Sequence, residues 1–312
     1  MTPAIDVVVV SYNSRDTLRA CVEPLAALDE VSVIVVDNAS ADQSLETIAD
    51  LPIRTVASEH NRGFGAGCNL GLAAGDSPFV LFLNPDAYIS EEALRRLAEV
   101  LVSEPEVGIV GPRTIAADGA LVRSMRRYQR VGSVWATALF AHRVFKRAAW
   151  ANEIVTSDDV YEHAAYPEWL SGGCLLARRS VLESVRGFDE GFFLYNEDMD
   201  LCVRVRAAGY KVRYEPTALA RHEGGRSAPR TALYAVLARS RMRFARQHAG
   251  SMSAGFQRLG LATGALTHVI VNAARPAHRR GHIAALQAIV RPAPQEEAGV
   301  SPRPARQGAG VP

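Results

Sequence analysis

The sequence predicts an α/β fold in which a mixed, mainly parallel sheet carries helices on both faces. Short, continuous apolar runs such as Ile5–Ser11 and Phe79–Leu83 are typical of strands that are buried on both faces. These runs alternate with helical segments at regular spacing over the first 110 residues, as in repeated strand–helix–strand units. With 312 residues and 48% hydrophobic content, the chain can bury a large core.

The N-terminal part contains five expected strands and four expected helices. The strands are expected at residues 5–11, 31–36, 53–57, 79–83 and 107–110. The first helix is expected to be capped at residues 12–14 and to end near residue 28, and the second to begin near residue 41. The third is expected to begin in the Gly-rich segment 61–71, and the fourth to span about residues 91–102.

The pattern changes beyond residue 165. Residues 169–177 are expected to form a strand whose paired glycines, Gly172 and Gly173, allow another group to approach the backbone. A helix capped by Asn196 and ended by Gly209 is expected next. The other expected elements are a short helix at 178–185, an aromatic loop at 188–195, short strands at 211–214 and 218–220, and an amphipathic helix within 229–250.

The cysteines and the apolar stretches favour a cytoplasmic protein without a membrane-spanning helix. Cys21, Cys68, Cys174 and Cys202 are scattered, and no signal peptide precedes the first strand, so we expect reduced thiols and no disulfides. The longest apolar stretch near the C-terminus, residues 259–274, is shorter than the roughly 20 residues that a spanning helix needs.

Charge is distributed unevenly along the chain. Residues 226–295 contain eleven arginines and no Asp or Glu, and a second basic block spans 123–147. We therefore expect an acidic domain at 1–225, a basic helical region at 226–291 and a disordered tail at 292–312. The basic segments favour contact with an anionic membrane surface, and we expect no nucleic-acid partner. Alternatively, the helix within 229–250 packs on the first domain with a solvated basic side.

Asp86 follows the buried strand at residues 79–83. It is therefore expected at the rim where open α/β sheets bind ligands, and a short carboxylate there can hold a divalent cation against phosphate oxygens. The alternative is a helix cap, because Asn84, Asp86 and Ser90 all suit a turn before a helix.

The Gly-rich segment at residues 61–71 raises the alternative of a dinucleotide-binding dehydrogenase. Gly63 and Gly65 resemble the start of a dinucleotide-binding fingerprint, with Asp86 at about the position of its ribose-binding acid. However, Cys68 occupies the third glycine position, and the segment follows the third expected strand rather than the first. Asp37 and Asp86 also end two different strands, which one nicotinamide site does not require. The sequence therefore disfavours a dehydrogenase.

Three acids, Glu197, Asp198 and Asp200, begin the helix that follows Asn196. Acids at a helix N-terminus complement its dipole, and Asp200 can pair with Arg204 one turn later, which explains Asp200. This structural role does not explain a carboxylate next to the aromatic loop, where apolar surroundings can tune a general base.

Taken in chain order, several short motifs of this sequence resemble those of family-2 inverting glycosyltransferases of the GT-A fold, and among them the bacterial rhamnosyltransferase type. The resemblance covers about residues 5–248. It rests on the ordered motifs Val10-Ser-Tyr-Asn13, Val36-Asp-Asn-Ala-Ser40, Asn61-Arg-Gly-Phe-Gly65 with Asn69, Leu83-Asn-Pro-Asp-Ala87, Trp169 with Ser171-Gly172-Gly173, Tyr195-Asn-Glu-Asp-Met-Asp-Leu201, and His222 with Gly225.

The resemblance implies a nucleotide-diphospho-sugar donor, with dTDP-rhamnose as the expected compound. Asp37 would recognise the base or ribose, and Arg62 would lie near the donor. Asp86 would be the last acid of a DXD-like motif that binds Mg²⁺ or Mn²⁺, with His222 as a second metal ligand. Asp198 would be the general base.

The resemblance also places residues around these groups. On the donor side these are Ser11, Tyr12, Asn13, Asn38, Asn69 and Asn84. Glu197 would stand beside the base, and the acceptor side would hold Trp169, Gly172 and Gly173. In this chain Asn84 occupies the position of the first acid of the DXD pattern, so the metal site has one negative charge fewer.

The implied reaction is a single displacement at the anomeric carbon. A cation stabilises the charge on the leaving diphosphate, and one carboxylate takes the proton of the acceptor hydroxyl. The expected acceptor is a glycan or a polyprenyl-diphosphate-linked sugar in cell-envelope polysaccharide synthesis, met at the inner face of the membrane. Two alternatives stay open: a binding module of the same fold without turnover, and a sugar nucleotidyltransferase, although Ser11-Tyr12-Asn13 replaces the Gly-rich triphosphate loop of the latter.

Overall fold

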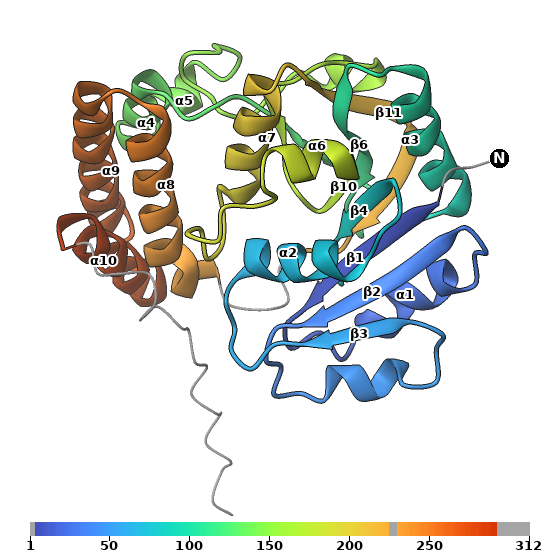
Figure 1. The fold of residues 1–312 in the computed structure, drawn as a ribbon. Helices are drawn as coiled ribbons and strands as arrows, with labels where there is room; N and C mark the ends of the chain where they lie inside the picture. The colour runs from blue at the N-terminus through green and yellow to red at the C-terminus, as the bar shows by residue number, and fades with distance from the viewer. Residues whose placement is uncertain (1–3, 225–229, 292–312) are drawn as a thin grey trace, which may run out of the picture.

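The computed structural model describes residues 4–224 and 230–291, and a nine-stranded sheet forms its centre (Figure 1). The strand order is β3-β2-β1-β4-β10-β6-β11-β5, with β7 paired to β6. Strands β3, β2, β1 and β4 are parallel, whereas β10 is antiparallel to β4 and β6, and β5 is antiparallel to β11. The predicted mixed, mainly parallel sheet is therefore confirmed.

The strands are β1 (Ile5–Ser11), β2 (Val31–Asp37), β3 (Arg54–Ala57), β4 (Phe79–Leu83), β5 (Ala87–Ile89), β6 (Val107–Ile115), β7 (Leu121–Val122), β8 (Met125–Arg126), β9 (Trp169–Leu170), β10 (Cys174–Arg178) and β11 (Lys211–His222). The α-helices are α1 (Leu18–Ala26), α2 (Phe64–Ala74), α3 (Glu91–Ser103), α4 (Val131–Ala138), α5 (Ala141–Val144), α6 (Arg179–Ser184), α7 (Glu197–Ala207), α8 (Tyr234–His248), α9 (Ser251–Val271) and α10 (Pro276–Val290). Three 3-10 helices are η1 (Ser44–Ile48), η2 (Asp158–Glu162) and η3 (Arg230–Leu233).

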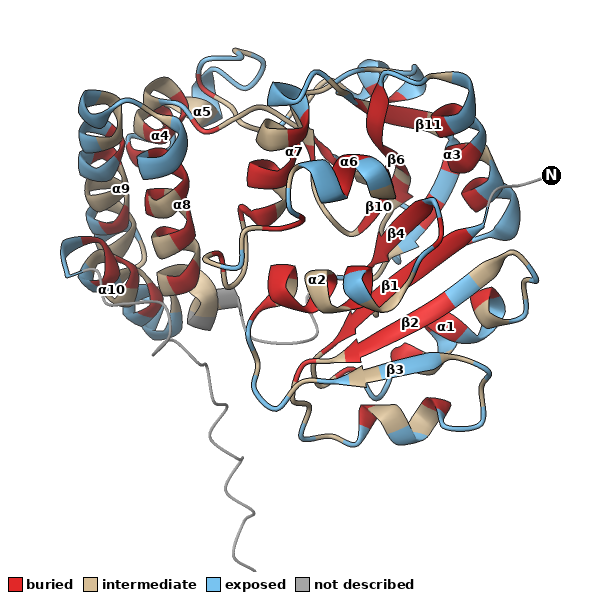
Figure 2. Ribbon diagram, viewed as in Figure 1, coloured by how far each residue is buried: buried red, intermediate tan, exposed pale blue. Residues whose placement is uncertain are grey.

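Both faces of the sheet are covered, which explains the continuous apolar runs. On β1, Val7 and Val9 lie in a hydrophobic cluster with residues of α1 and α3. Val8 and Val10 lie in a second cluster with residues of α2, α6 and α7. Figure 2 shows the central strands buried along most of their length. A strand with two covered faces has no polar side, so its residues need not alternate in polarity.

Two expected helix starts near the N-terminus are wrong. Helix α1 begins at Leu18, later than predicted, because the preceding polar residues bond to the next loop along the sheet edge. The Asn13 Oδ1 atom accepts a hydrogen bond from the backbone N–H of Ala41 (2.8 Å), and the Ser14 N–H donates to Ser44 Oγ (3.0 Å). In place of the helix expected near residue 41, the chain forms only η1.

Residues 169–177 form two strands rather than the single strand predicted. Strand β9 pairs with β8 in a small two-stranded sheet, whereas β10 lies between β4 and β6 in the main sheet. The chain passes from one sheet to the other through Ser171, Gly172 and Gly173. Conversely, the two short strands predicted at 211–214 and 218–220 are one strand, β11, with a register shift between Glu215 and Leu219.

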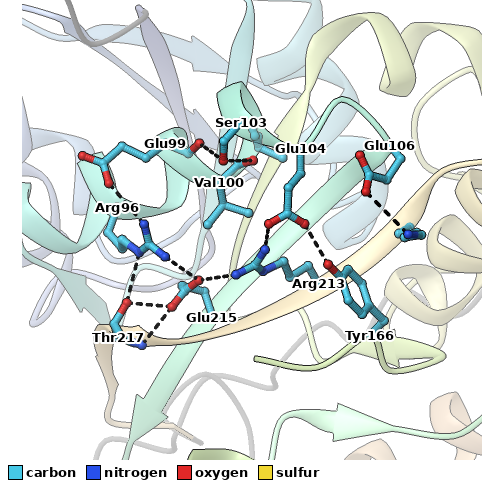
Figure 3. A network of polar contacts seen from close by, with 12 residues as sticks. Arg96, Glu99, Val100, Ser103, Glu104, Glu106, Tyr166, Arg213, Glu215 and Thr217 are labelled. Carbon is cyan, nitrogen blue, oxygen red and sulfur yellow. Dashed lines mark hydrogen bonds and ion pairs between the residues drawn. The ribbon is translucent and has the colours of Figure 1, made fainter. Parts of the chain in front are cut away.

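A buried ion-pair network holds β11 to α3 (Figure 3). The Glu215 side chain, which is 2% exposed, accepts hydrogen bonds from Arg96 of α3 (3.2 Å) and from Arg213 (2.9 Å). Arg213 also forms an ion pair with Glu104 at the end of α3. Because β11 ends at His222, the network anchors the strand that carries this histidine.

The C-terminal helices α8, α9 and α10 pack together with α4 at one side of the molecule (Figure 1). Helix α8 is also fastened to the sheet domain, since Ser240 Oγ donates to the Leu194 carbonyl (2.7 Å) and Phe244 packs on Phe192. Arg243, expected on a solvated side of this helix, forms an ion pair with Asp189 (2.8 Å). Helix α8 therefore packs with both its apolar side and part of its basic side.

Several expectations concern the chain ends and the thiols. All four cysteines are free and buried. Within residues 4–224 and 230–291, no helix is both long enough and apolar enough to cross a bilayer. The tail at 292–312 and Gly225 lie outside the described residues, and the domain boundary at residue 225 stays a prediction.

Candidate active site

The candidate site lies where the parallel strands end. Ser11 ends β1 and Asp37 ends β2, and the two residues are partners in the parallel register. Asn84 and Asp86 follow β4, the other neighbour of β1. The carboxyl ends of three adjacent strands thus bring together segments that are separated in the sequence, at the sheet edge where α/β folds bind ligands.

Asp86 and His222 face each other at this edge. The Asp86 Oδ1 atom lies 3.0 Å from His222 Nε2, and the amide nitrogen of Asn84 lies 3.2 Å from the same imidazole nitrogen. Burial raises the pKa of Asp86, but the hydrogen bond and charge of His222 lower it, and the net direction is downward. Asp86 therefore favours the charged form that a cation requires.

This pair fits a divalent cation. A carboxylate oxygen and an imidazole nitrogen converge within 3.0 Å, and both are groups that bind such ions. Among the described residues, no cluster of three or more His, Cys, Asp and Glu side chains could enclose a metal. The geometry suits a cation that takes its other ligands from a phosphate-bearing substrate.

The donor side contains two buried oxygens without partners among the described residues: Asp37 Oδ1 and Ser11 Oγ. The other Asp37 oxygen accepts from the Ser40 N–H (3.1 Å), which fixes the carboxylate at the strand end. A buried polar atom without a partner is destabilising unless a ligand or water satisfies it. Asp37 Oδ1 can therefore accept a hydrogen bond from a bound molecule, and Ser11 Oγ can accept or donate one. The half-buried Tyr12 follows Ser11 in the chain.

Three other donor-side candidates use their side chains to hold the protein together. The Asn38 amide donates to Asn61 Oδ1 (2.9 Å) and to the Gly63 carbonyl (3.1 Å). The Asn69 amide donates to the Phe188 carbonyl (2.9 Å), and its oxygen accepts from the Phe188 N–H (2.8 Å). Asn13 holds the loop at residue 41, as described above. These asparagines position the loops around the site.

Arg62 is tied to the loop that precedes the acidic motif. Its guanidinium lies 2.5 Å from the Glu190 carboxylate, and both side chains are partly exposed. Next to it, Gly63 has a φ of 91°, and a Cβ at this position would meet the Phe193 carbonyl oxygen at 2.1 Å. The Gly-rich segment and the aromatic loop therefore touch through backbone contacts that only glycine permits.

Asp198 lies at the start of α7, opposite the β9–β10 turn. Its Oδ2 atom accepts from the Gly172 N–H (2.9 Å), and its Oδ1 atom accepts from the Met199 N–H (2.8 Å). Burial raises the pKa of Asp198, while these two N–H groups and the charge of Arg126 oppose the rise. A raised pKa brings the carboxylate closer to the range useful for a general base.

Glu197 is 5% exposed, and its Oε2 atom has no hydrogen-bond partner in the described part of the chain. Burial, followed by the charge of Asp198, raises the pKa of Glu197 well above its ordinary value. Burial thus disfavours the charged form of both neighbouring acids, Glu197 and Asp198. Asn196 occupies the N-cap position but makes no side-chain cap hydrogen bond.

The turn between β9 and β10 joins the two halves of the site. Gly172 donates to Asp198, and the carbonyl of the next residue, Gly173, accepts from the Asn84 N–H (3.0 Å). A Cβ on Gly172 would lie 3.3 Å from Asp198 Cβ, and a Cβ on Gly173 would lie 3.2 Å from His222 Nδ1. Two consecutive glycines therefore separate the carboxylate from the Asp86–His222 pair.

Arg126 is a residue of this site that sequence reasoning did not identify. Its guanidinium lies over the Trp169 ring (5.9 Å to the centroid), and its charge acts on Asp198. The Trp169 indole N–H donates to the Arg127 carbonyl (2.9 Å), so the ring supports Arg126 from a fixed position. The sequence showed only that Arg126 belongs to a basic block. It gave no sign that β8 pairs with β9 beside the acidic motif.

The aromatic loop packs beside the start of α7. Phe192 is fully buried and packs on Met199 and Phe244, so it joins α7 to the C-terminal helix α8. Burial is the largest cause of the raised pKa of Asp198, the neighbour of Met199.

The fold and the site define a glycosyltransferase with the GT-A fold. The chain belongs to glycosyl transferase family 2, whose model matches residues 6–186. It is 30% identical over 246 residues to N-acetylglucosaminyl-diphospho-decaprenol L-rhamnosyltransferase of Mycobacterium tuberculosis, covering 74% of this chain and 79% of the relative. It is 26% identical over 225 residues to the rhamnosyltransferase WbbL of Escherichia coli K12, covering 69% of this chain and 82% of the relative.

Solved structures support the fold assignment. The mannosyltransferase PcManGT of Pyrobaculum calidifontis, solved in complex with GDP-Man and Mn²⁺, matches with a TM-score of 0.57 at 16% identity, covering 93% of this chain and 88% of that one. Residues 1–349 of S. aureus TarS, in complex with UDP-GlcNAc, match with a TM-score of 0.51 at 17% identity, covering 91% of both chains. At these identities the similarity shows the fold alone.

Proposed function

We propose that this glycosyltransferase transfers L-rhamnose from dTDP-rhamnose to a hydroxyl group of a lipid-diphosphate-linked sugar during cell-envelope polysaccharide synthesis. One observation carries the proposal: consecutive glycines hold a carboxylate, Asp198, and a metal-binding pair, Asp86 and His222, on either side of one turn. The choice of sugar and acceptor rests on the relatives, which are named as rhamnosyltransferases, one of them acting on a diphospho-decaprenol compound.

In the proposed reaction, the acceptor hydroxyl attacks the anomeric carbon and the configuration inverts. Asp198 takes the hydroxyl proton, and the N–H groups of Gly172 and Met199 hold its carboxylate in place. A divalent cation, Mg²⁺ or Mn²⁺, would be held by Asp86 and His222 and would stabilise negative charge on the leaving diphosphate. Asp37 and Ser11 bind the nucleoside through their unpartnered oxygens. No enzyme nucleophile is needed in a single displacement.

The enzyme would work at the cytoplasmic face of a membrane, because its proposed acceptor has a lipid tail. Arg143, Lys146 and Arg147 in the second basic block are exposed and have no ion pair among the described residues. In contrast, Arg241 and Arg243 of α8 pair with Glu153 and Asp189. The anionic-surface proposal therefore rests mainly on the second basic block.

A ligand-binding and turnover series tests the proposal. Melting temperatures would be measured with a panel of nucleotide-sugars, each with and without Mn²⁺, because a ligand that binds the folded state raises the melting temperature. We expect dTDP-rhamnose with Mn²⁺ to give the largest rise. Transfer to a synthetic prenyl-diphosphate-linked N-acetylglucosamine would then be assayed. Donor binding without any transfer to this or other glycan acceptors would instead favour a binding module, the alternative to which Asn84 gives weight.

A further inference from the structure

A basic cavity lies outside the site described above. It has a volume of about 640 Å³ and is formed by α5 and the segment that follows it. The basic side chains that line it are those of Arg123, His142, Arg143, Lys146 and Arg147. We call this cavity the Arg143 pocket.

Two cations of the Arg143 pocket have acidic neighbours. Arg123 pairs with Asp158 (2.9 Å), at the edge of the pocket, and the charge of Arg147 acts on Asp159. Among the described residues, no ion pair forms with Arg143, Lys146 or Arg147, and all three are exposed. Three adjacent positive charges repel one another, so an anion that bridges them lowers the electrostatic energy.

The backbone of the pocket is fixed rather than loose. The Asn152 amide donates to the carbonyls of Phe145 (2.7 Å) and Lys146 (3.0 Å), and the Thr156 hydroxyl donates to the same Lys146 carbonyl (3.0 Å). His142 Nδ1 lies 3.1 Å from the Ala136 carbonyl, which joins α5 to the end of α4. These bonds fix the backbone that carries the basic residues before any ligand binds, so only their side chains must be ordered on binding.

Exposed apolar side chains lie close in sequence to the residues that line the pocket, at positions 139–150. Val144 is 78% exposed, Leu139 59%, Trp150 55% and Phe145 51%. Phe145 and Trp150 also contact each other, with their ring centroids 5.5 Å apart. Large apolar groups next to a cluster of cations suit an amphiphile that has a phosphate-bearing head and a hydrocarbon tail.

The pocket is connected to the candidate base by a short path. Arg123 precedes Ser124, whose carbonyl accepts from the Ser171 N–H (3.0 Å), and the residue after Ser171 is Gly172, which donates to Asp198. This pairing places Arg123, which lines the pocket, and Gly172, which bonds to the candidate base, on neighbouring segments of the chain.

We propose that the Arg143 pocket binds the diphosphate of the lipid-linked acceptor, with Arg143, Lys146 and Arg147 on the phosphates and the exposed apolar residues on the first units of the prenyl tail. This inference rests on the proposed function, because it places that function's acceptor. It assigns to this cavity a substrate class distinct from the nucleotide-sugar, which binds at Asp37 and Asp86.

The test measures binding of farnesyl diphosphate to the full chain by calorimetry, in EDTA so that no cation can hold a diphosphate at Asp86 and His222. The test variant combines Arg143→Gln, Lys146→Gln and Arg147→Gln. The matched control combines Arg275→Gln, Arg279→Gln and Arg280→Gln, which removes the same charge from exposed arginines of α10 and its N-cap. We expect the test variant to raise the Kd by about tenfold or more and the control to change it less than about twofold.

Two further arms separate the sources of the phosphate. Trp150→Ala should weaken binding of farnesyl diphosphate but leave binding of inorganic pyrophosphate unchanged, because pyrophosphate has no tail. Vesicles that contain phosphatidylglycerol form the second arm. If the test variant loses vesicle binding but keeps farnesyl diphosphate binding, the pocket recognises phospholipid headgroups and the proposal is overturned.

Failure of this proposal is distinguishable from failure of the proposed function. Binding of dTDP-rhamnose with Mn²⁺, measured on the same test variant, should match that of the unmodified chain. If donor binding is intact and farnesyl diphosphate binds equally to the unmodified chain and the test variant, the acceptor assignment of the pocket is wrong, while the donor assignment stands.

Discussion

Asp86 and His222, which are 136 positions apart in the sequence, lie with their Oδ1 and Nε2 atoms 3.0 Å apart at the edge of the central sheet. The contact exists because β5, which follows Asp86, pairs with the last residues of β11, so that Ala87 is the register partner of His222. Strand pairing thus brings together the two groups that we propose as cation ligands, although the sequence leaves them far apart.

Replacing either member of this pair should weaken metal-dependent donor binding. We expect Asp86→Ala and His222→Ala each to reduce the affinity for nucleotide diphosphate in Mn²⁺ by about tenfold or more, since even outer partners of a metal are worth that much. Calorimetry with and without Mn²⁺ measures the effect, with Asp118→Ala as an exposed control. Unchanged metal dependence in Asp86→Ala would remove this aspartate from the site.

Asp198→Asn should separate catalysis from donor binding. We expect transfer to fall by roughly 10²–10⁴-fold, the usual contribution of a general base, while donor affinity changes little. The amide keeps the shape of the carboxylate but cannot accept a proton. Glu197→Gln is the control and should cost less activity, because the Gly172 N–H of the β9–β10 turn bonds to Asp198 and not to Glu197. Near-normal turnover in Asp198→Asn would move the base to another carboxylate.

Substituting the two glycines of the β9–β10 turn should change different kinetic parameters of the enzyme. Gly172→Ala would press on Asp198 and Gly173→Ala on His222, at 3.3 Å and 3.2 Å respectively. We expect Gly172→Ala to lower kcat about tenfold, because small misplacements of a catalytic group are costly. Gly173→Ala should instead raise the Mn²⁺ concentration needed for half-maximal activity. Gly255→Ala, which meets nothing within 4 Å, is the control. Identical effects of both substitutions would contradict the division of the site.

Glu215 should make stability depend on pH. Burial by itself raises the pKa of Glu215. Hydrogen bonds from Thr217 and the charges of Arg96 and Arg213 together lower it by more than burial raises it, so the net shift is downward. A lowered folded-state pKa means that this stabilisation is present above the unfolded pKa of about 4.3 and is lost as the pH falls below it. Glu215→Gln should cost about 3 kcal/mol at pH 7, since it removes one partner of a buried ion pair.

Urea denaturation at pH 7 and at successively lower pH measures this effect. The difference between Glu215→Gln and the unmodified chain should shrink as the pH falls below about 4, because the carboxylate of the unfolded chain then binds a proton while the native carboxylate, with its lowered pKa, does so only at lower pH. Glu99→Gln, whose side chain is 65% exposed, is the control and should change stability by less than about 1 kcal/mol. A difference that is the same at every pH would show that the charge of Glu215 is not responsible.

Binding to membranes should depend on charge and on the second basic block. We expect stronger co-sedimentation with vesicles that contain phosphatidylglycerol than with neutral vesicles, and weaker binding as salt is added. Removing the three cations at positions 143, 146 and 147 should reduce binding more than removing three from α10. Binding that is indifferent to both lipid charge and salt would reject the electrostatic part of this proposal.

The sequence by itself determined the layered α/β fold and placed the candidate acids Asp86 and Asp198 at the ends of its elements. Continuous apolar runs are typical of strands covered on both faces, and Asp86, three residues after the end of such a run, is therefore expected at the edge of the sheet. The motif order then pointed to family 2. These are local features, because the residues that define each strand, turn and cap are neighbours in the chain.

Only the tertiary structure decided how these pieces meet. The break of residues 169–177 into β9 and β10 depends on which strands pair, and it places Gly172 and Gly173 between Asp198 and His222. The pairing of β8 with β9 likewise brings Arg126 to Asp198. Strand partners and burial are set by contacts between distant segments, so neither the position of Arg126 nor the raised pKa of Asp198 is encoded in any short stretch of sequence.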